Sequence, residues 1–82
     1  MNFDSFLELL KQSNFDVGYL AVIKDWYSRV CDFSSCDSLR KEYYCQLRGV
    51  LVTMTALNFI NIDDCKKIGY ELFDKYVMGL KG

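Results

Sequence analysis

Histidine and proline are both absent from the sequence, and each absence excludes a set of structures or functions. Histidine is the commonest general base and metal ligand, and it usually activates the nucleophile of a serine or cysteine hydrolase. Its absence therefore argues against hydrolases that use a catalytic triad. Because proline is missing and only five glycines are present, no linker or domain boundary is indicated. We expect one domain that spans residues 1–82.

The four cysteines lack the spacing of a metal site or of a redox motif. Cys31, Cys36, Cys45 and Cys65 follow the pattern C-x4-C-x8-C-x19-C, whereas zinc knuckles and thiol oxidoreductases use a C-x2-C pair. The glycine-rich loops that bind nucleotides and the acidic loop that binds calcium are also missing. We therefore expect no metal, no cofactor and no enzymatic activity. All four thiols should stay reduced, and the three at helical positions beside apolar neighbours should pack as small buried side chains.

Targeting signals and a long apolar run are missing as well. The first residues have neither the positive charge nor the apolar stretch of a secretory signal, and the longest uncharged stretch, 49–62, is too short to span a bilayer. We expect a soluble, cytoplasmic protein. Ten basic and eleven acidic residues give a net charge of −1, so no overall field attracts nucleic acid or an anionic membrane.

Helical periodicity covers nearly all of the chain and predicts an all-α fold. Apolar residues recur at intervals of three and four in segments that run from about 2 to 12, 16 to 33, 39 to 59 and 61 to 81. Asn2, Asp4 or Ser5 can cap the first of these helices, and Asn61 is well placed to cap the last. The short connections should bring neighbouring helices together. The expected architecture is a small, compact four-helix bundle around the third helix.

The third helix is predicted to be long and largely buried. From Gly49 onward its residues leave hardly any polar face, so this half should be enclosed on all sides. A strand over 50–55 is the competing interpretation, but no second strand is available to pair with it. If this half is the core, Leu57→Ala should cost about 2 to 5 kcal/mol of stability.

The second and fourth helices have clear inner and outer faces. Asp25 and Arg29 stand four residues apart on the outer face of the second helix, in the order that favours a surface ion pair. Its inner stripe is predicted to comprise Tyr19, Leu20, Ile23, Trp26, Tyr27, Val30 and Phe33. On the outside of the fourth helix we expect Lys67, Glu71 and Lys75. Its inner face is predicted to comprise Cys65, Ile68, Gly69, Leu72, Phe73, Tyr76 and Leu80.

A basic cluster is predicted on the solvent side of the third helix. Arg40, Lys41 and Arg48 lie within about two turns of one another, with Tyr44 between them. Such a face can bind phosphates and bases. Glu42 interrupts it, however, and no recognition-helix or RNA-binding motif accompanies it. An ordinary solvated face explains the same residues, so nucleic-acid binding is the alternative function rather than the first.

Two tyrosines on otherwise polar faces are the candidates for contact with a partner protein. Tyr44 stands with Arg40, Lys41 and Arg48 on the third helix, and Tyr70 stands near Lys67 on the fourth. Tyrosine and arginine dominate the energetic centres of protein interfaces. Each ring can instead lean over a neighbouring helix. We therefore expect a partner-binding surface on one helix or on the other.

The amount of apolar side chain also favours a binding role. Hydrophobic residues make up 51% of the chain and aromatic residues 16%, although a domain of this size buries only roughly 60% of its unfolded surface. We expect a non-enzymatic module that occludes a partner protein. Immunity proteins and small inhibitors encoded by phages or plasmids are an analogy of size only. The alternative function is that of a small nucleic-acid-associated regulator. A two-fold homodimer is also expected, because it would cover an exposed apolar patch.

Overall fold

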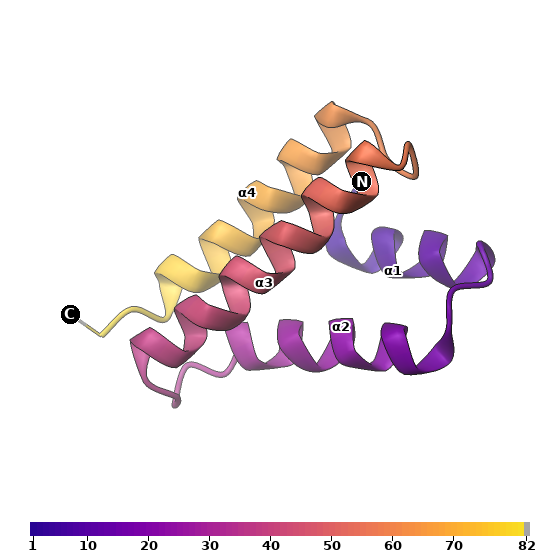
Figure 1. The fold of residues 1–82 in the computed structure, drawn as a ribbon. Coiled ribbons are helices and arrows are strands. Elements are labelled where there is room, and N and C mark those ends of the chain that lie inside the picture. Colours follow the sequence, from indigo (N-terminus) through magenta and orange to yellow (C-terminus); the bar gives the residue numbers. More distant parts are fainter. Residues whose placement is uncertain (82) are drawn as a thin grey trace.

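Four helices joined by short turns make up the computed structural model, which describes residues 1–81 (Figure 1). They are α1 (Phe3–Gln12), α2 (Val17–Val30), α3 (Asp37–Ala56) and α4 (Ile62–Met78). The predicted all-α fold is confirmed. However, α2 and α3 end earlier than predicted, at Val30 and Ala56 rather than near residues 33 and 59.

The helices form two hairpins, α1 with α2 and α3 with α4, and the second hairpin lies diagonally across the first in Figure 1. α3 packs against α2 and α4, and α1 packs against the same two helices, which also touch each other. The backbones of α1 and α3 do not approach each other. α3 makes the two most extensive helix–helix contacts, with α2 and with α4, as the expected bundle around the third helix requires.

The core consists of one stripe from each helix, at the helical spacing that the sequence predicts. Asn2 caps α1 by accepting from the backbone amide of Ser5, and Asn61 caps α4 by accepting from that of Asp64. With these helices in place, the bundle encloses Phe3, Phe6, Leu10, Leu20, Ile23, Val30, Leu47, Leu51, Met54, Ile60, Ile68 and Leu72.

The second half of α3 is only partly buried, so the prediction that it is enclosed on all sides is wrong. Leu47, Leu51 and Met54 are buried, but 59% of Val52 is exposed, and 58% of Leu57 just beyond the helix end. These side chains are exposed because α3 has few neighbouring helices. Because α3 is flanked only by α2 and α4, the face that points away from both is open to solvent even where its residues are apolar.

One turn connects the two helices of each hairpin, and both turns are of the same kind. Asn14 and Asn58 adopt left-handed backbone conformations, with φ of 61° and 63°. The amide of the following residue, Phe15 or Phe59, donates to the carbonyl five residues earlier, as in a Schellman motif. The rings of Phe15 and Phe59 then meet edge to face, with their centroids 4.9 Å apart. These contacts join the two hairpins at one end of the bundle.

The start of α1 is tied to both α2 and α4. The Phe3 ring stacks on Tyr27 with centroids 4.1 Å apart, and its backbone amide donates to the Glu71 carboxylate at 3.3 Å. Glu71 is therefore half-buried rather than on the outside of α4, as its spacing had suggested. Burial of Tyr27, together with the nearby charges of Cys31 and Glu71, raises the pKa of its hydroxyl.

Candidate functional site

Arg40 is fully buried, so its predicted position on the solvent side of the third helix is wrong. Its Nε and Nη2 atoms donate to the carbonyl oxygen of Val30 at 3.0 and 2.7 Å. Nη1 donates to the carbonyl oxygen of Tyr76 at 3.0 Å, and Nη2 also donates to that of Lys75 at 2.9 Å. The guanidinium thus joins the C-terminal ends of α2 and α4.

The charge of Arg40 is balanced by helix ends rather than by an acid. Among residues 1–81, no carboxylate lies within 4 Å of its nitrogen atoms. The C-terminal end of a helix carries a partial negative charge and carbonyls without helical partners, so two such ends suit a buried cation. Arg40 also lies over the rings of Phe33 and Tyr76, at 5.0 and 5.6 Å. Its role in this fold is structural.

Tyr44 and Arg48 contact each other where α3 packs against α4. The Tyr44 ring is half-buried and stacks on Tyr76, with centroids 5.2 Å apart and planes 8° apart. Arg48 Nη1 donates to the Tyr44 hydroxyl at 3.3 Å, and its guanidinium lies 6.0 Å from the centre of that ring. A Cβ atom on Gly69 would come within 3.1 Å of Arg48 Nη1. Glycine therefore leaves room for Arg48 to lie over α4.

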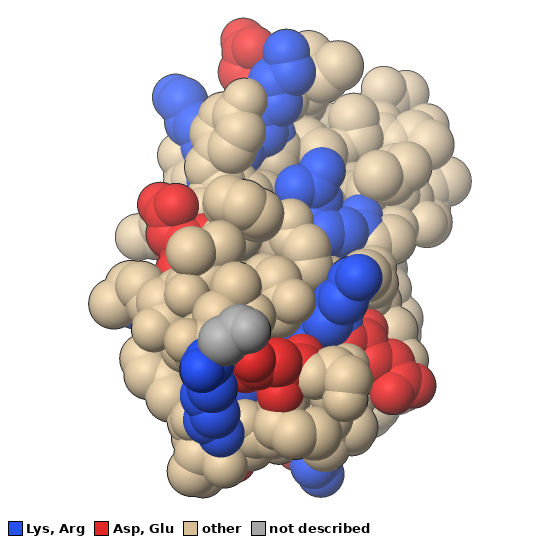
Figure 2. Space-filling view, turned by 90° about the vertical axis from the view of Figure 1, so that its left-hand side faces the viewer, with Lys and Arg blue, Asp and Glu red and all other residues tan. Residues whose placement is uncertain are grey.

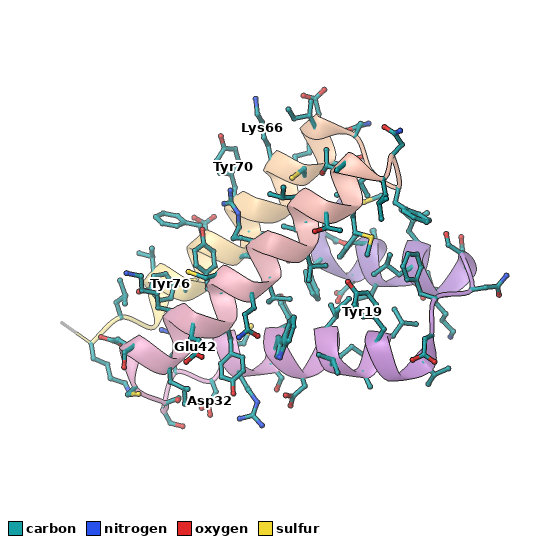
Figure 3. The ribbon with its side chains drawn as sticks, in the orientation of Figure 1. Tyr19, Asp32, Glu42, Lys66, Tyr70 and Tyr76 are labelled. Atoms are coloured by element: carbon teal, nitrogen blue, oxygen red, sulfur yellow. The ribbon has the colours of Figure 1, made fainter. Side chains whose placement is uncertain are left out.

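Tyr70 stands about one turn before Phe73 on α4, and because the Phe73 ring lies beside Tyr44 on α3, the tyrosines of α3 and α4 share one surface. Tyr70 is 64% exposed, and Figure 3 shows it projecting from α4 away from the bundle, as Lys66 does. Phe73 and Val77 continue the exposed strip, and the Phe73 ring lies 6.3 Å from that of Tyr44. We call this surface the α3–α4 face. It comprises Tyr44, Arg48, Tyr70, Phe73 and Val77.

The structure therefore combines what the sequence had offered as alternatives. Tyr44 and Arg48 come from one predicted surface and Tyr70 from the other, and helix packing brings all three together. Phe73 was assigned to the inner face of α4, but it is 48% exposed; Leu80, assigned to the same face, is 44% exposed. The signal that sequence reasoning missed is a second apolar stripe on α4, offset from the buried one.

Basic side chains lie beside the α3–α4 face without forming a continuous patch. Lys41 on α3 and Lys66 and Lys67 on α4 are exposed, as predicted for Lys41 and Lys67. Asp74 on α4 is exposed as well. On the side of the molecule seen in Figure 2, Lys and Arg side chains are separated by uncharged surface and by Asp and Glu side chains. The face is therefore aromatic and apolar with charges of both signs at its margins.

Within residues 1–81 there is no cluster of histidine, cysteine or acidic side chains placed to hold a metal ion, and no pocket. Cys36 and Cys45 are exposed and the other two cysteines are half-buried, so the three that were predicted at helical positions are less buried than expected. Hydrogen bonds from the Leu39 backbone amide and from Ser38 lower the pKa of the Cys36 thiol. None of the helices in this part of the chain is long and apolar enough to cross a membrane.

No known protein family, curated protein or solved structure matches this chain. The chemistry of the α3–α4 face is therefore the basis for the function proposed below.

Proposed function

We propose that this chain is a non-enzymatic, cytoplasmic protein-binding module that uses the α3–α4 face to cover a surface of a partner protein. It would act by occlusion, as inhibitors and immunity proteins do, and a phage or other mobile element is a source that suits a chain of this size. One observation carries the proposal. Tyr70, Phe73 and Val77 expose 64%, 48% and 43% of their surface beside Arg48 on one continuous face.

Exposed aromatic and apolar side chains on one face support a binding role because folding gains little from them. Burying apolar surface contributes roughly 25 cal/mol per Å² removed from water, and this gain is available to a partner only where the surface is still exposed. Tyrosine and arginine are also enriched among the residues that contribute most to protein–protein affinity. The α3–α4 face offers two tyrosines and one arginine within a short distance.

The arrangement of Arg48 adds a second physical reason. A free arginine side chain loses rotational freedom when a partner binds it, which lowers affinity. Here the hydrogen bond to the Tyr44 hydroxyl and the close fit over Gly69 already restrict the guanidinium. A carboxylate on the partner would therefore meet a partly ordered cation, which can pair with it in the two-pronged geometry typical of arginine.

The test requires one partner and matched variants of this chain. A partner captured from the native host is purified, and its affinity is measured for the parent and for Tyr70→Ala. Tyr70 is mostly exposed, so the variant should fold normally and bind the partner about thirtyfold more weakly. Val17→Ala is the control, because Val17 is 79% exposed on α2, away from the face. Equal affinity of Tyr70→Ala and the parent would overturn the proposal.

Nucleic-acid binding is the alternative, and a separate binding measurement addresses it. The contact of Arg48 with the Tyr44 ring, near the exposed Lys41, resembles the basic and aromatic chemistry that holds single strands. Burial of Arg40 removes one cation from the predicted basic cluster. Affinity for DNA or RNA that falls steeply with salt, and is lost in Lys41→Ala and Arg48→Ala, would replace the first proposal with this one.

A further inference from the structure

The seam between α3 and α4, which runs through the α3–α4 face, is basic on its α3 side. At 100° per residue, Lys41 leaves α3 about 20° from Arg48, whereas Glu42 leaves it about 120° away. Asp37 is the other acid of this helix, and it is half-buried about three turns from Arg48. Its carboxylate already accepts from the backbone amide of Lys81. The acids of α3 therefore lie away from this part of the seam.

The charges of α4 are sorted in the same way about Tyr70. Phe73 marks the side of α4 that faces α3, because its ring lies beside that of Tyr44. Lys66 leaves α4 on this side too, about 40° from Tyr70 by helical geometry, and Figure 3 shows both projecting from the helix. All other charged residues of α4 leave it on the opposite side of Tyr70, toward α1: Asp63, Asp64, Lys67, Glu71, Asp74 and Lys75.

The three seam cations, Lys41, Arg48 and Lys66, have no acidic partner in the described part of the chain. The ion pairs within residues 1–81 lie elsewhere, at the N-terminus and on α2. Arg48 donates one hydrogen bond, from Nη1 to the neutral Tyr44 hydroxyl. Because a guanidinium has several N–H donors, most of those of Arg48 are open to a ligand. The seam is thus a row of exposed cations beside an exposed apolar strip.

We infer that the α3–α4 face recognises an acidic, apolar segment of its partner protein. Carboxylates of the segment lie along the seam, and its apolar side chains cover Tyr70, Phe73 and Val77. This inference rests on the function proposed above and adds the chemistry of the partner. Arg48 takes one carboxylate in its two-pronged geometry. The charges select the partner and speed its association, while apolar contact supplies most of the affinity.

The spacing of the cations fits a short segment. Arg48 lies at the level of Gly69. With 1.5 Å per residue, Lys66 stands about 4.5 Å from that level in one direction and Lys41 about 10.5 Å in the other, because the two helices are antiparallel. Carboxylates about one turn and about two turns apart on a partner helix would match these intervals.

A protein segment fits these observations better than a nucleic acid does. Nucleic acids gain affinity by the neutralisation of many phosphates, whereas the seam offers three cations on a chain with a net charge of −1. Phe73 and Val77 are 48% and 43% exposed, and they offer apolar contact that a phosphate backbone cannot use. A few carboxylates among apolar side chains use both parts of the face.

A random peptide library displayed on phage tests this chemistry. The library is first depleted on Tyr70→Ala, which removes peptides that bind elsewhere, and is then selected on the parent chain. The retained peptides should contain Asp or Glu more often than the unselected library does, together with apolar side chains. Circular dichroism of each variant separates a lost contact from a lost fold.

Synthetic copies of the retained peptides then locate the contact. They should bind Arg48→Gln about tenfold more weakly than the parent. Lys24→Gln removes an exposed cation on α2, so it is the matched control and should bind as the parent does. Replacing the acids of a peptide with their amides should weaken its binding to the parent by at least as much, and this loss should shrink at high salt.

Three results would overturn the inference: retained peptides without an excess of acids, acidic peptides that bind Arg48→Gln as tightly as the parent, or no retained peptide at all. A single-stranded DNA oligonucleotide that binds more tightly than every peptide would do the same. The captured partner keeps the two proposals separate. If Tyr70→Ala weakens its binding and Arg48→Gln does not, the face is right and the acidic ligand is wrong. If neither variant weakens it, the proposed function itself fails.

Discussion

Replacing Arg40 with methionine removes the one buried charge among the described residues while keeping a long apolar side chain in its place. Four hydrogen bonds are lost, and with them the link between the end of α2 and the end of α4. The Val30 carbonyl accepts two of these bonds in a buried position, so methionine leaves it without a donor. The carbonyls of Lys75 and Tyr76 are part-buried, so water can replace some of the hydrogen bonds that they lose.

The cost follows from these partners. Hydrogen bonds from a charged group contribute about 1.5 to 3 kcal/mol, and a buried acceptor left without a partner costs about 1 to 3 kcal/mol. Allowing for water at the two part-buried carbonyls, we expect Arg40→Met to cost about 3 to 5 kcal/mol, as when a buried ion pair loses one partner. At about 0.05 to 0.15 kcal/mol per residue, the whole domain has only about 4 to 12 kcal/mol of stability.

Thermal and urea unfolding, followed by circular dichroism, measure this effect. For a domain of this size each kcal/mol moves the melting temperature by about 4 to 8 °C, so Arg40→Met should melt at least about 12 °C below the parent. Arg40→Lys keeps the charge but not the forked donor geometry, and should fall in between. Arg29→Met, which breaks the exposed pair with Asp25 and the contact with the Tyr43 ring but no buried hydrogen bond, is the control. If Arg40→Met and Arg29→Met melt together, the buried role of Arg40 is wrong.

Three further predictions test the turns, the core and an acidic group. Asn58→Ala should cost about 1 kcal/mol because alanine resists a left-handed backbone, while Asn58→Gly should be nearly neutral; equal melting temperatures would refute the turn assignment. Leu51→Ala should cost about 2 to 5 kcal/mol, whereas Leu57→Ala should have a much smaller effect, in place of the large one expected from the sequence. Hydrogen bonds from Ser34 lower the pKa of Asp32. The ionised carboxylate therefore stabilises the fold fully above the unfolded-state pKa of about 3.9, and this stabilisation is lost as the pH falls through the folded-state pKa. The stability difference between the parent and Asp32→Asn should therefore shrink from pH 7 to about pH 3, and a constant difference in urea melts would contradict it.

Local information was enough to determine the helices and several of their details. Apolar spacing placed four helices, the capping role of Asn61 followed from its residue type and position, and Asn2 was one of three candidates for the cap of the first helix. The ion pair between Asp25 and Arg29, with nitrogen and oxygen 2.9 Å apart, was also predictable, because its partners stand four residues apart on one helix. All of these features depend on neighbours within one or two turns of the chain.

The faces of the helices were harder to predict. Apolar residues around the second half of α3 suggested burial on all sides, and the spacing of α4 assigned Phe73 to its inner face, yet the bundle gives α3 only two close neighbours and leaves one side of α4 open. Val52, Leu57 and Phe73 are therefore exposed although their residue types resemble those of the core. A periodic pattern shows that a stripe exists, but packing decides which stripe is covered.

By itself, then, the sequence determined that the chain is helical, roughly where each helix begins, and which residue types could contact a partner. The tertiary structure decided which of those residues are available. The sequence places Arg40 on the surface because Lys41 and Glu42 directly after it are charged, but its acceptors at Lys75 and Tyr76 are 35 and 36 residues away. Tyr44, Arg48 and Tyr70 form one face only because α3 and α4 pack side by side, with Gly69 admitting Arg48 between them. Contacts between residues so far apart in the chain depend on the packing of whole helices, which local spacing and composition do not specify.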